Sequence, residues 1–238
     1  MSTSAEGFKV MTIPKTDQIS DVSKMYEARF TATGLEKRNK VWKVLCSTFF
    51  QKLIPEDAAV LDLACGYGEF INNIQARQKL AVDLNPESEK FLNRDVTFYR
   101  TVATDLGEIQ ARSLDVVFTS NFLEHLPTKA ACNTVMSQVK TVLRPGGKFI
   151  VLGPNIRYAY AEYWDYYDHY LPLSHLSLAE GLGNAGFDIE KVIPRFLPYT
   201  MKNRTPTHPF LIRAYLAFPV AWNILGKQFL VTATKPAP

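Results

Sequence analysis

The stretch VLDLACGYGEF, residues 60–70, decides the fold of this chain. A short apolar strand over residues 60–63 leads into a turn built on Gly66 and Gly68, and the pattern predicts a helix from Phe70. Glycines at such a turn permit positive φ and let a ligand approach the backbone closely. A strand, a glycine turn and a helix in this order are typical of a nucleotide site, because the first amides of the helix point at the ligand.

The spacing of the turn narrows the class of ligand. A dinucleotide fingerprint requires a third small residue three positions after Gly68, and that position holds Ile71. Asp62 at the strand end would place a negative charge beside a pyrophosphate, so it suits a cationic ligand instead. The pattern therefore disfavours a dehydrogenase.

Further apolar runs follow in the order expected for alternating strands and helices. They cover residues 80–86, 96–106, 114–126 and 144–155. The first contains Asp83, placed about twenty residues after Asp62, where an acid at a strand end accepts hydrogen bonds from ribose hydroxyls. Strands that alternate with helical segments predict a doubly wound α/β sheet.

Together these segments resemble the S-adenosylmethionine-dependent methyltransferases with the seven-stranded Rossmann-like fold, of the type 11-like small-molecule kind. The resemblance covers residues 58–155. It implies an α/β fold with a doubly wound, mostly parallel seven-stranded sheet, helices on both faces, an antiparallel last strand and substrate-side insertions. It also implies S-adenosyl-L-methionine as the cofactor.

The resemblance further implies which residues contact this cofactor. They come from the strand ends and from the N-terminal segment: Asp62, Ala64, Gly66, Gly68, Asp83, Leu84, Asp105, Leu106, Asn121 and Tyr26. Asp62 would lie near the amino acid part of the cofactor, Asp83 at the ribose and Asp105 at the adenine amino group. Tyr26 and Arg29 belong to a segment that closes the cofactor pocket in relatives.

Some of these residues also have structural explanations. Taken alone, Asp62 could cap a helix and Asp83 could form a turn. Their joint placement at successive strand ends favours the cofactor. Glu124 and His125 lie at the end of the run over residues 114–126, where a helix is predicted to begin after the fourth strand, and packing is favoured over catalysis for His125.

The composition agrees with a single enzyme domain over residues 1–238. With 47% hydrophobic residues and a net charge of +4, the chain can build a full core and is not expected to bind nucleic acid. The expected parts are an N-terminal arm with helices, a cofactor-binding core and two substrate-side insertions, at residues 1–54, 55–155, 156–177 and 194–227. Three cysteines without metal-ligand spacing, and no secretory signal, predict a cytoplasmic protein.

The two insertions are where the acceptor is expected to bind. The first holds seven tyrosine and tryptophan residues, which suit the wall of a substrate pocket and equally a packed lid. In the second, Arg213 and Pro219 interrupt an apolar run, so it is a poor candidate for spanning a bilayer. A roof over the active site or a homodimer contact is favoured there over a membrane-surface segment at residues 208–227.

The cofactor sets the reaction class. In an in-line methyl transfer the protein aligns the acceptor, and it removes a proton when the acceptor is a hydroxyl. His169 beside Asp168 is the predicted base and His125 the next candidate. Because no acids have a spacing that requires a metal, we predict metal-independent O-methylation of a small-molecule or glycan acceptor. N-methylation of a small heterocycle or amine, and a noncatalytic cofactor-binding partner subunit, are the alternatives.

Overall fold

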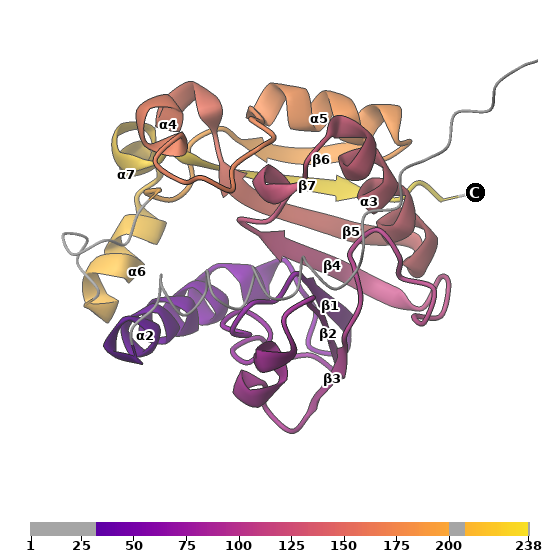
Figure 1. Ribbon diagram of the computed structural model, residues 1–238. Coiled ribbons are helices and arrows are strands. Elements are labelled where there is room, and N and C mark those ends of the chain that lie inside the picture. The colour runs from indigo at the N-terminus through magenta and orange to yellow at the C-terminus, as the bar shows by residue number, and fades with distance from the viewer. Residues whose placement is uncertain (1–31, 200–207, 238) are drawn as a thin grey trace, which may run out of the picture.

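The computed structural model describes residues 32–199 and 208–237. Within these ranges seven strands form one sheet in the order β3-β2-β1-β4-β5-β7-β6 (Figure 1). The strands are β1 (Ala59–Leu63), β2 (Gln78–Val82), β3 (Val96–Tyr99), β4 (Leu114–Ser120), β5 (Leu143–Pro154), β6 (Asp188–Ile193) and β7 (Gln228–Thr234). Strands β1 to β5 pair in parallel, whereas β7 is antiparallel to both β5 and β6. The expected seven-stranded sheet with an antiparallel last strand is confirmed.

The central strands are buried on both faces, which explains their continuous apolar runs. Successive side chains of a strand point to opposite faces. In β1, Leu61 belongs to one core cluster and Val60 to the other; in β5, Phe149 and Ile150 divide in the same way. Two cores therefore enclose the sheet, one on each face.

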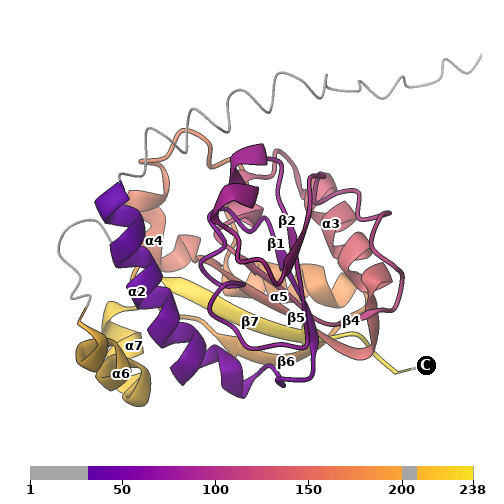
Figure 2. The same cartoon turned by 90° about the horizontal axis from the view of Figure 1, so that it is seen from below.

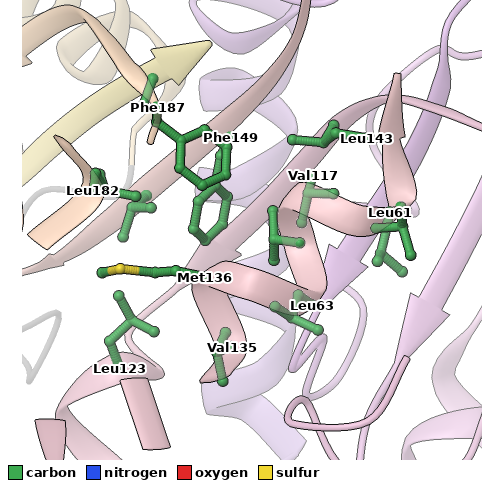
Figure 3. Packing of buried hydrophobic residues seen from close by; sticks show 14 of the residues in the cluster. Leu61, Leu63, Val117, Leu123, Val135, Met136, Leu143, Phe149, Leu182 and Phe187 are labelled. Atoms are coloured by element: carbon green, nitrogen blue, oxygen red, sulfur yellow. The ribbon is translucent and has the colours of Figure 1, made fainter. Parts of the chain in front are cut away.

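Helices cover both faces of this sheet. They are α2 (Ala32–Thr48), α3 (Lys129–Val142), α4 (Ile156–Tyr163), α5 (His175–Asn184), α6 (Pro209–Ala217) and α7 (Pro219–Leu225). Met136 of α3 and Leu182 of α5 pack with Phe149 on one face (Figure 3). Trp42 of α2 and Ile212 of α6 belong to the core of the other face. Figure 1 shows α5 and α2 on opposite sides of the strands.

The prediction of a helix from Phe70 is wrong. Residues 69–74 form turns, and only two backbone bonds have helical spacing, from Asn72 to Gly68 and from Ile74 to Phe70. The Asn73 side chain donates to the Glu69 carbonyl at 2.8 Å, so side-chain bonds take backbone groups that a helix would use. The glycine turn is thus followed by a compact loop rather than by a helix.

Two predicted runs are also shorter than expected. The strand predicted within residues 96–106 ends at Tyr99, and the one within residues 114–126 ends at Ser120. The remaining short elements are the 3-10 turns η1 (Phe50–Lys52), η2 (Pro86–Phe91) and η3 (Leu123–His125). The helix expected near His125 is therefore a single 3-10 turn, and α3 begins four residues later.

Candidate active site

The carboxyl ends of β2, β1 and β4 lie side by side, because these strands are parallel neighbours in the sheet. The glycine turn follows β1, Asp83 follows β2, and Asn121 follows β4. Open α/β sheets bind their ligands at this edge. The fold therefore brings three separate parts of the predicted cofactor site to one place.

The turn after β1 has an unusual backbone. Ala64, Gly66 and Gly68 all have positive φ, at 59°, 55° and 71°. A Cβ atom added at Gly68 would lie 2.5 Å from a methyl carbon of Leu92, so this position accepts only glycine without rearrangement. Ala64 adopts a conformation that costs a residue with a side chain about 1 to 2 kcal/mol.

Asp83 holds this turn in place. Its Oδ2 accepts a hydrogen bond from the Gly66 amide at 2.8 Å, and its Oδ1 accepts one from the Asn85 amide at 2.8 Å. The residue is buried, at 6% exposure. A backbone hydrogen bond from Leu84 also stabilises the carboxylate, which leaves about one of its roughly four acceptor positions for a ligand. A ribose hydroxyl can occupy that position.

Two further buried acids lie close to Asp83. Burial raises the pKa of Asp62 well above its ordinary value, and the charges of Glu69 and Asp83 add to the rise. Burial also raises the pKa of Glu69, although Arg38 of α2 forms an ion pair with it at 2.9 Å and opposes the rise. A nearby positive charge favours the ionised form of such acids. This group of residues therefore fits the sulfonium and ammonium groups of S-adenosylmethionine.

The other predicted cofactor residues flank this edge. Leu84 directly follows Asp83 and is partly exposed. Asn121 is exposed and has a φ of 49°, a left-handed conformation that asparagine tolerates better than most residues. Asp105 is exposed in the loop after β3, and Leu106 is buried. The roles assigned to these residues stay predictions.

Two residues of the N-terminal segment cannot be placed. Tyr26 and Arg29 lie outside the described residues. The α2 residue that does reach the glycine turn is Arg38, through its ion pair with Glu69. The sequence analysis did not select Arg38, because nothing in the sequence signals a pairing across 31 positions.

A second polar group lies beyond β4. His125, at the end of η3, places its Nδ1 2.9 Å from the Asp168 carboxylate and 2.9 Å from the Asp168 carbonyl oxygen. The Glu124 carbonyl accepts backbone bonds from Tyr170 and Leu171 at 2.8 and 3.0 Å. These bonds fasten the aromatic insertion to the end of β4.

His169 packs against the same group. Its ring centroid lies 4.9 Å from that of His125, 4.6 Å from that of Tyr163 and 4.9 Å from that of Tyr166. Its Nδ1 lies 3.5 Å from the hydroxyl of Tyr199, which precedes α6. The structure brings both predicted catalytic histidines together, and it places the Asp168 carboxylate at the Nδ1 of His125.

The pKa values of His125 and Glu124 are both raised, for different reasons. Burial would lower the pKa of His125, but its hydrogen bond to Asp168 and the charges of Glu124 and Asp168 outweigh that effect and raise it. Burial raises the pKa of Glu124 from its ordinary 4.5 to about 7, against an opposing effect of His125. The side chain of His125 is 30% exposed and that of Asp168 is 10% exposed. Asp168 therefore fixes the orientation of the imidazole, and part of the His125 side chain is exposed.

The same residues include one group with the composition of a metal site. Among the described residues, Glu124, His125 and His169 each place one potential ligand atom within 4.8 Å of the others. Two imidazoles and one carboxylate are donors that transition metals accept. The expectation of a metal-independent enzyme stays a prediction.

Comparisons with known proteins agree with this geometry. The model of a family described as methyltransferase domain matches residues 35–192. A ubiquinone biosynthesis O-methyltransferase of Xanthomonas axonopodis pv. citri (strain 306) is 33% identical over 110 residues, 42% of this chain and 44% of that protein. The sterol 4-C-methyltransferase strm-1 of Caenorhabditis elegans is 28% identical over 158 residues, 62% of this chain and 46% of that protein.

A solved structure shows the same fold. The SAM dependent methyltransferase from Archaeoglobus fulgidus has a TM-score of 0.59 and 21% identity, over 81% of this chain and 94% of that one. The family match, the strand order and the glycine turn establish that the chain belongs to the S-adenosylmethionine-dependent methyltransferases with a Rossmann-like fold. The chain spans less than half the length of the curated relatives it matches.

The buried acids predict an unusual dependence of stability on pH. Asp62, Glu69, Asp83 and Glu124 all have raised pKa values, so the folded chain binds more protons than the unfolded chain between the ordinary and the raised values. The free energy of unfolding of the cofactor-free protein should therefore increase as the pH falls from about 8 to about 5. The raised pKa of His125 acts in the same direction, because its stabilising effect is lost as the pH rises through that value.

Glu124 offers a direct check. Glu124→Gln should reduce the change in the free energy of unfolding between pH 8 and pH 5 by at most about 3 kcal/mol. Urea denaturation at both pH values would measure this. Glu108→Gln, at an exposed loop position, is the matched control and should leave the slope unchanged. A free energy of unfolding that increases steadily toward pH 8 in the unmodified protein would contradict the raised pKa values of these buried acids.

Proposed function

We propose that this chain catalyses S-adenosylmethionine-dependent O-methylation of a small-molecule acceptor, with His125 as the group that receives the acceptor's proton. The observation that carries the proposal is the pair of His125 and Asp168, joined at 2.9 Å beside the carboxyl end of β4. A base held by a third group is the arrangement that activates hydroxyl nucleophiles. This assignment reverses the roles that the sequence favours for His125 and His169.

Each group at the site has a defined part in the proposal. Bound S-adenosylmethionine supplies an electrophilic methyl group on a sulfonium. Asp83 holds the ribose, and Asp62 lies near the amino acid part. Asp168 keeps the proton of His125 on Nδ1, so that Nε2 is the nitrogen that accepts the hydroxyl proton. His169 limits the movement of the His125 ring by packing against it.

One of the two curated relatives supports O-methylation, whereas the other is named for methylation at carbon. The relative from Xanthomonas carries the name of an O-methyltransferase, and both curated relatives are named for apolar compounds, ubiquinone and sterol. We therefore extend the proposal to an apolar acceptor that bears a hydroxyl. A glycan acceptor remains the alternative, because tyrosines such as Tyr166 and Tyr199 also suit sugar rings.

Methyl transfer to extracted molecules tests the proposal. Purified protein is incubated with S-adenosylmethionine labelled in its methyl group and with lipid and aqueous cell extracts. Label should appear on oxygen in a product from the lipid extract, EDTA should leave the rate unchanged, and NAD should show no binding by calorimetry. The matched control is His125→Ala, which should bind the cofactor and transfer little label.

Other outcomes would replace the proposal. Label on nitrogen would show N-methylation, and label only from the aqueous extract would favour a glycan-type acceptor. Activity lost in EDTA and restored by a divalent cation would assign Glu124, His125 and His169 to a metal. Cofactor binding without transfer to any extract would favour a noncatalytic subunit.

A further inference from the structure

Helices α6 and α7 expose an apolar surface. Six large side chains share it, each exposed to 47% or more: Phe210, Leu211, Phe218, Val220, Ile224 and Leu225. They belong to one continuous stretch of chain, and Figures 1 and 2 both show α6 and α7 together at one end of the molecule beside α2. Scattered exposed apolar residues need no explanation, but a grouped set of this size marks a binding surface.

The orientation of these helices is fixed by their opposite sides. Ile212 and Leu216 of α6 are buried in the core shared with α2. Trp222 of α7 donates to the Tyr215 carbonyl at 2.8 Å, and Tyr215 donates to the Phe196 carbonyl at 2.6 Å. The exposed residues therefore project outward from an anchored element.

The end of α7 is held in the same way. Arg195 donates to the carbonyls of Ile224 and Gly226 at 2.7 and 2.8 Å, and its guanidinium lies 4.8 Å from the centre of the Tyr158 ring. These bonds satisfy carbonyls at the helix end. The contact of Arg195 with the Tyr158 ring also joins the second insertion to the aromatic one.

Charge indicates what covers the apolar surface. Residues 194–227 contain five basic residues and no acidic residue, and α2 adds four basic residues and one acidic residue. The whole chain contains 27 basic and 23 acidic residues, so this region is strongly basic and the remainder is acidic. Arg213, Lys37 and Lys43 are exposed. Apolar side chains beside basic ones are complementary to the surface of an anionic bilayer.

We propose that α6 and α7 dock on the surface of an anionic lipid bilayer, with the six exposed apolar side chains in the acyl boundary and the exposed Arg213, Lys37 and Lys43 on the head groups. No helix within residues 32–199 and 208–237 is long and apolar enough to cross a bilayer. A surface contact needs only one apolar face and a basic neighbourhood, and α6 and α7 present both. The proposal is independent of the methyl acceptor, since binding is measured without any turnover.

The position of the surface suits an exchange with lipid. The segment that leads from β6 toward α6 includes Tyr199, which lies beside His169. Gln228 at the start of β7 donates to the Pro198 carbonyl at 2.8 Å and holds this segment against the sheet. Tyr199 thus lies ten positions before Pro209, the first residue of α6.

Sedimentation with vesicles tests the proposal on the full chain. We expect the protein to sediment with phosphatidylcholine vesicles that contain about 30% phosphatidylglycerol and to bind pure phosphatidylcholine more weakly, with salt reducing the difference. The double variant Phe218→Glu/Ile224→Glu should lower the partition coefficient at least about tenfold, because it places charge in the acyl boundary. Cofactor affinity measured in the same variant confirms that the sheet remains folded.

A matched variant distinguishes binding through this surface from nonspecific binding through other exposed apolar residues. Ile189 is 38% exposed near the start of β6, whereas the segment that leads toward α6 leaves the other end of that strand, so Ile189→Glu should leave vesicle binding unchanged. Failure of the unmodified protein to bind either vesicle would overturn the proposal, as would equal losses in both variants. A dimer that the double variant converts to a monomer, with no vesicle binding, would instead assign the surface to a second copy of the chain. Methyl transfer to a soluble acceptor would be unaffected by each of these outcomes.

Discussion

Replacement of His125 by alanine should lower the turnover number by about 10² to 10⁴ and leave the affinity for S-adenosylmethionine unchanged. The loss is that of a general base, because the Asp168 carboxylate lies 2.9 Å from the Nδ1 of His125, whereas the Nδ1 of His169 lies 3.5 Å from the Tyr199 hydroxyl. Single-turnover kinetics with labelled cofactor would measure the loss, and calorimetry would measure the affinity.

The dependence of the rate on pH identifies the base more directly. His125 must be neutral to accept a proton, and its pKa is raised, so kcat/KM should increase with pH through a value above 6.5. Asp168→Asn removes a charge that raises this pKa, so the increase in kcat/KM should occur at lower pH. A merely structural role for Asp168 would lower the rate without changing the pH at which kcat/KM increases.

The comparison with His169 provides the control. His169→Ala removes a ring that packs on His125 and should lower turnover less than His125→Ala does. His175→Ala is the matched variant, since its ring bonds to Asn155 at 2.9 Å. If His169→Ala abolishes turnover while His125→Ala retains it at equal stability, His169 is the base and the assignment proposed above is wrong.

Asp83→Ala should weaken S-adenosylmethionine binding by about 1.5 to 3 kcal/mol, or roughly 10- to 150-fold. The carboxylate retains acceptor capacity for a ribose hydroxyl beside its bonds to the Gly66, Asn85 and Leu84 amides. Its removal also releases Gly66, so the turn loses the bond that fixes it. Calorimetric titration of the purified variant would measure the change.

A surface acid serves as the control for this variant. Asp95 forms an ion pair with Lys79 at 2.9 Å near the start of β3, at the opposite end of the strands from the glycine turn. Asp95→Ala should leave cofactor affinity unchanged. Urea denaturation of Asp83→Ala distinguishes lost binding from lost folding, and unchanged affinity in a folded Asp83→Ala protein would remove Asp83 from the ribose site.

The sequence alone was sufficient for the architecture. Continuous apolar runs predict strands buried on both faces, and their alternation with helical segments predicts a doubly wound α/β sheet. The resemblance to the methyltransferases implies the antiparallel last strand, which the pairing of β7 with β5 and β6 confirms. The edge where Asp62 and Asp83 meet is equally predictable, because each acid ends a strand and parallel neighbours end at the same edge. These features depend on local pattern and on chain order, and both are written in the sequence.

Tertiary structure alone decided the finer arrangement. The sequence places Asp168 beside His169, yet docking of the aromatic insertion on the Glu124 carbonyl turns the Asp168 carboxylate toward His125, 43 positions away. The missing helix after Gly68 has a similar origin, since the Asn73 side chain competes for backbone groups in a loop confined between two paired strands. The pairing of Arg38 with Glu69 and the outward face of α7 likewise result from packing between distant segments. Such contacts depend on which surfaces meet once the sheet has formed, and local sequence periodicity carries no information about that.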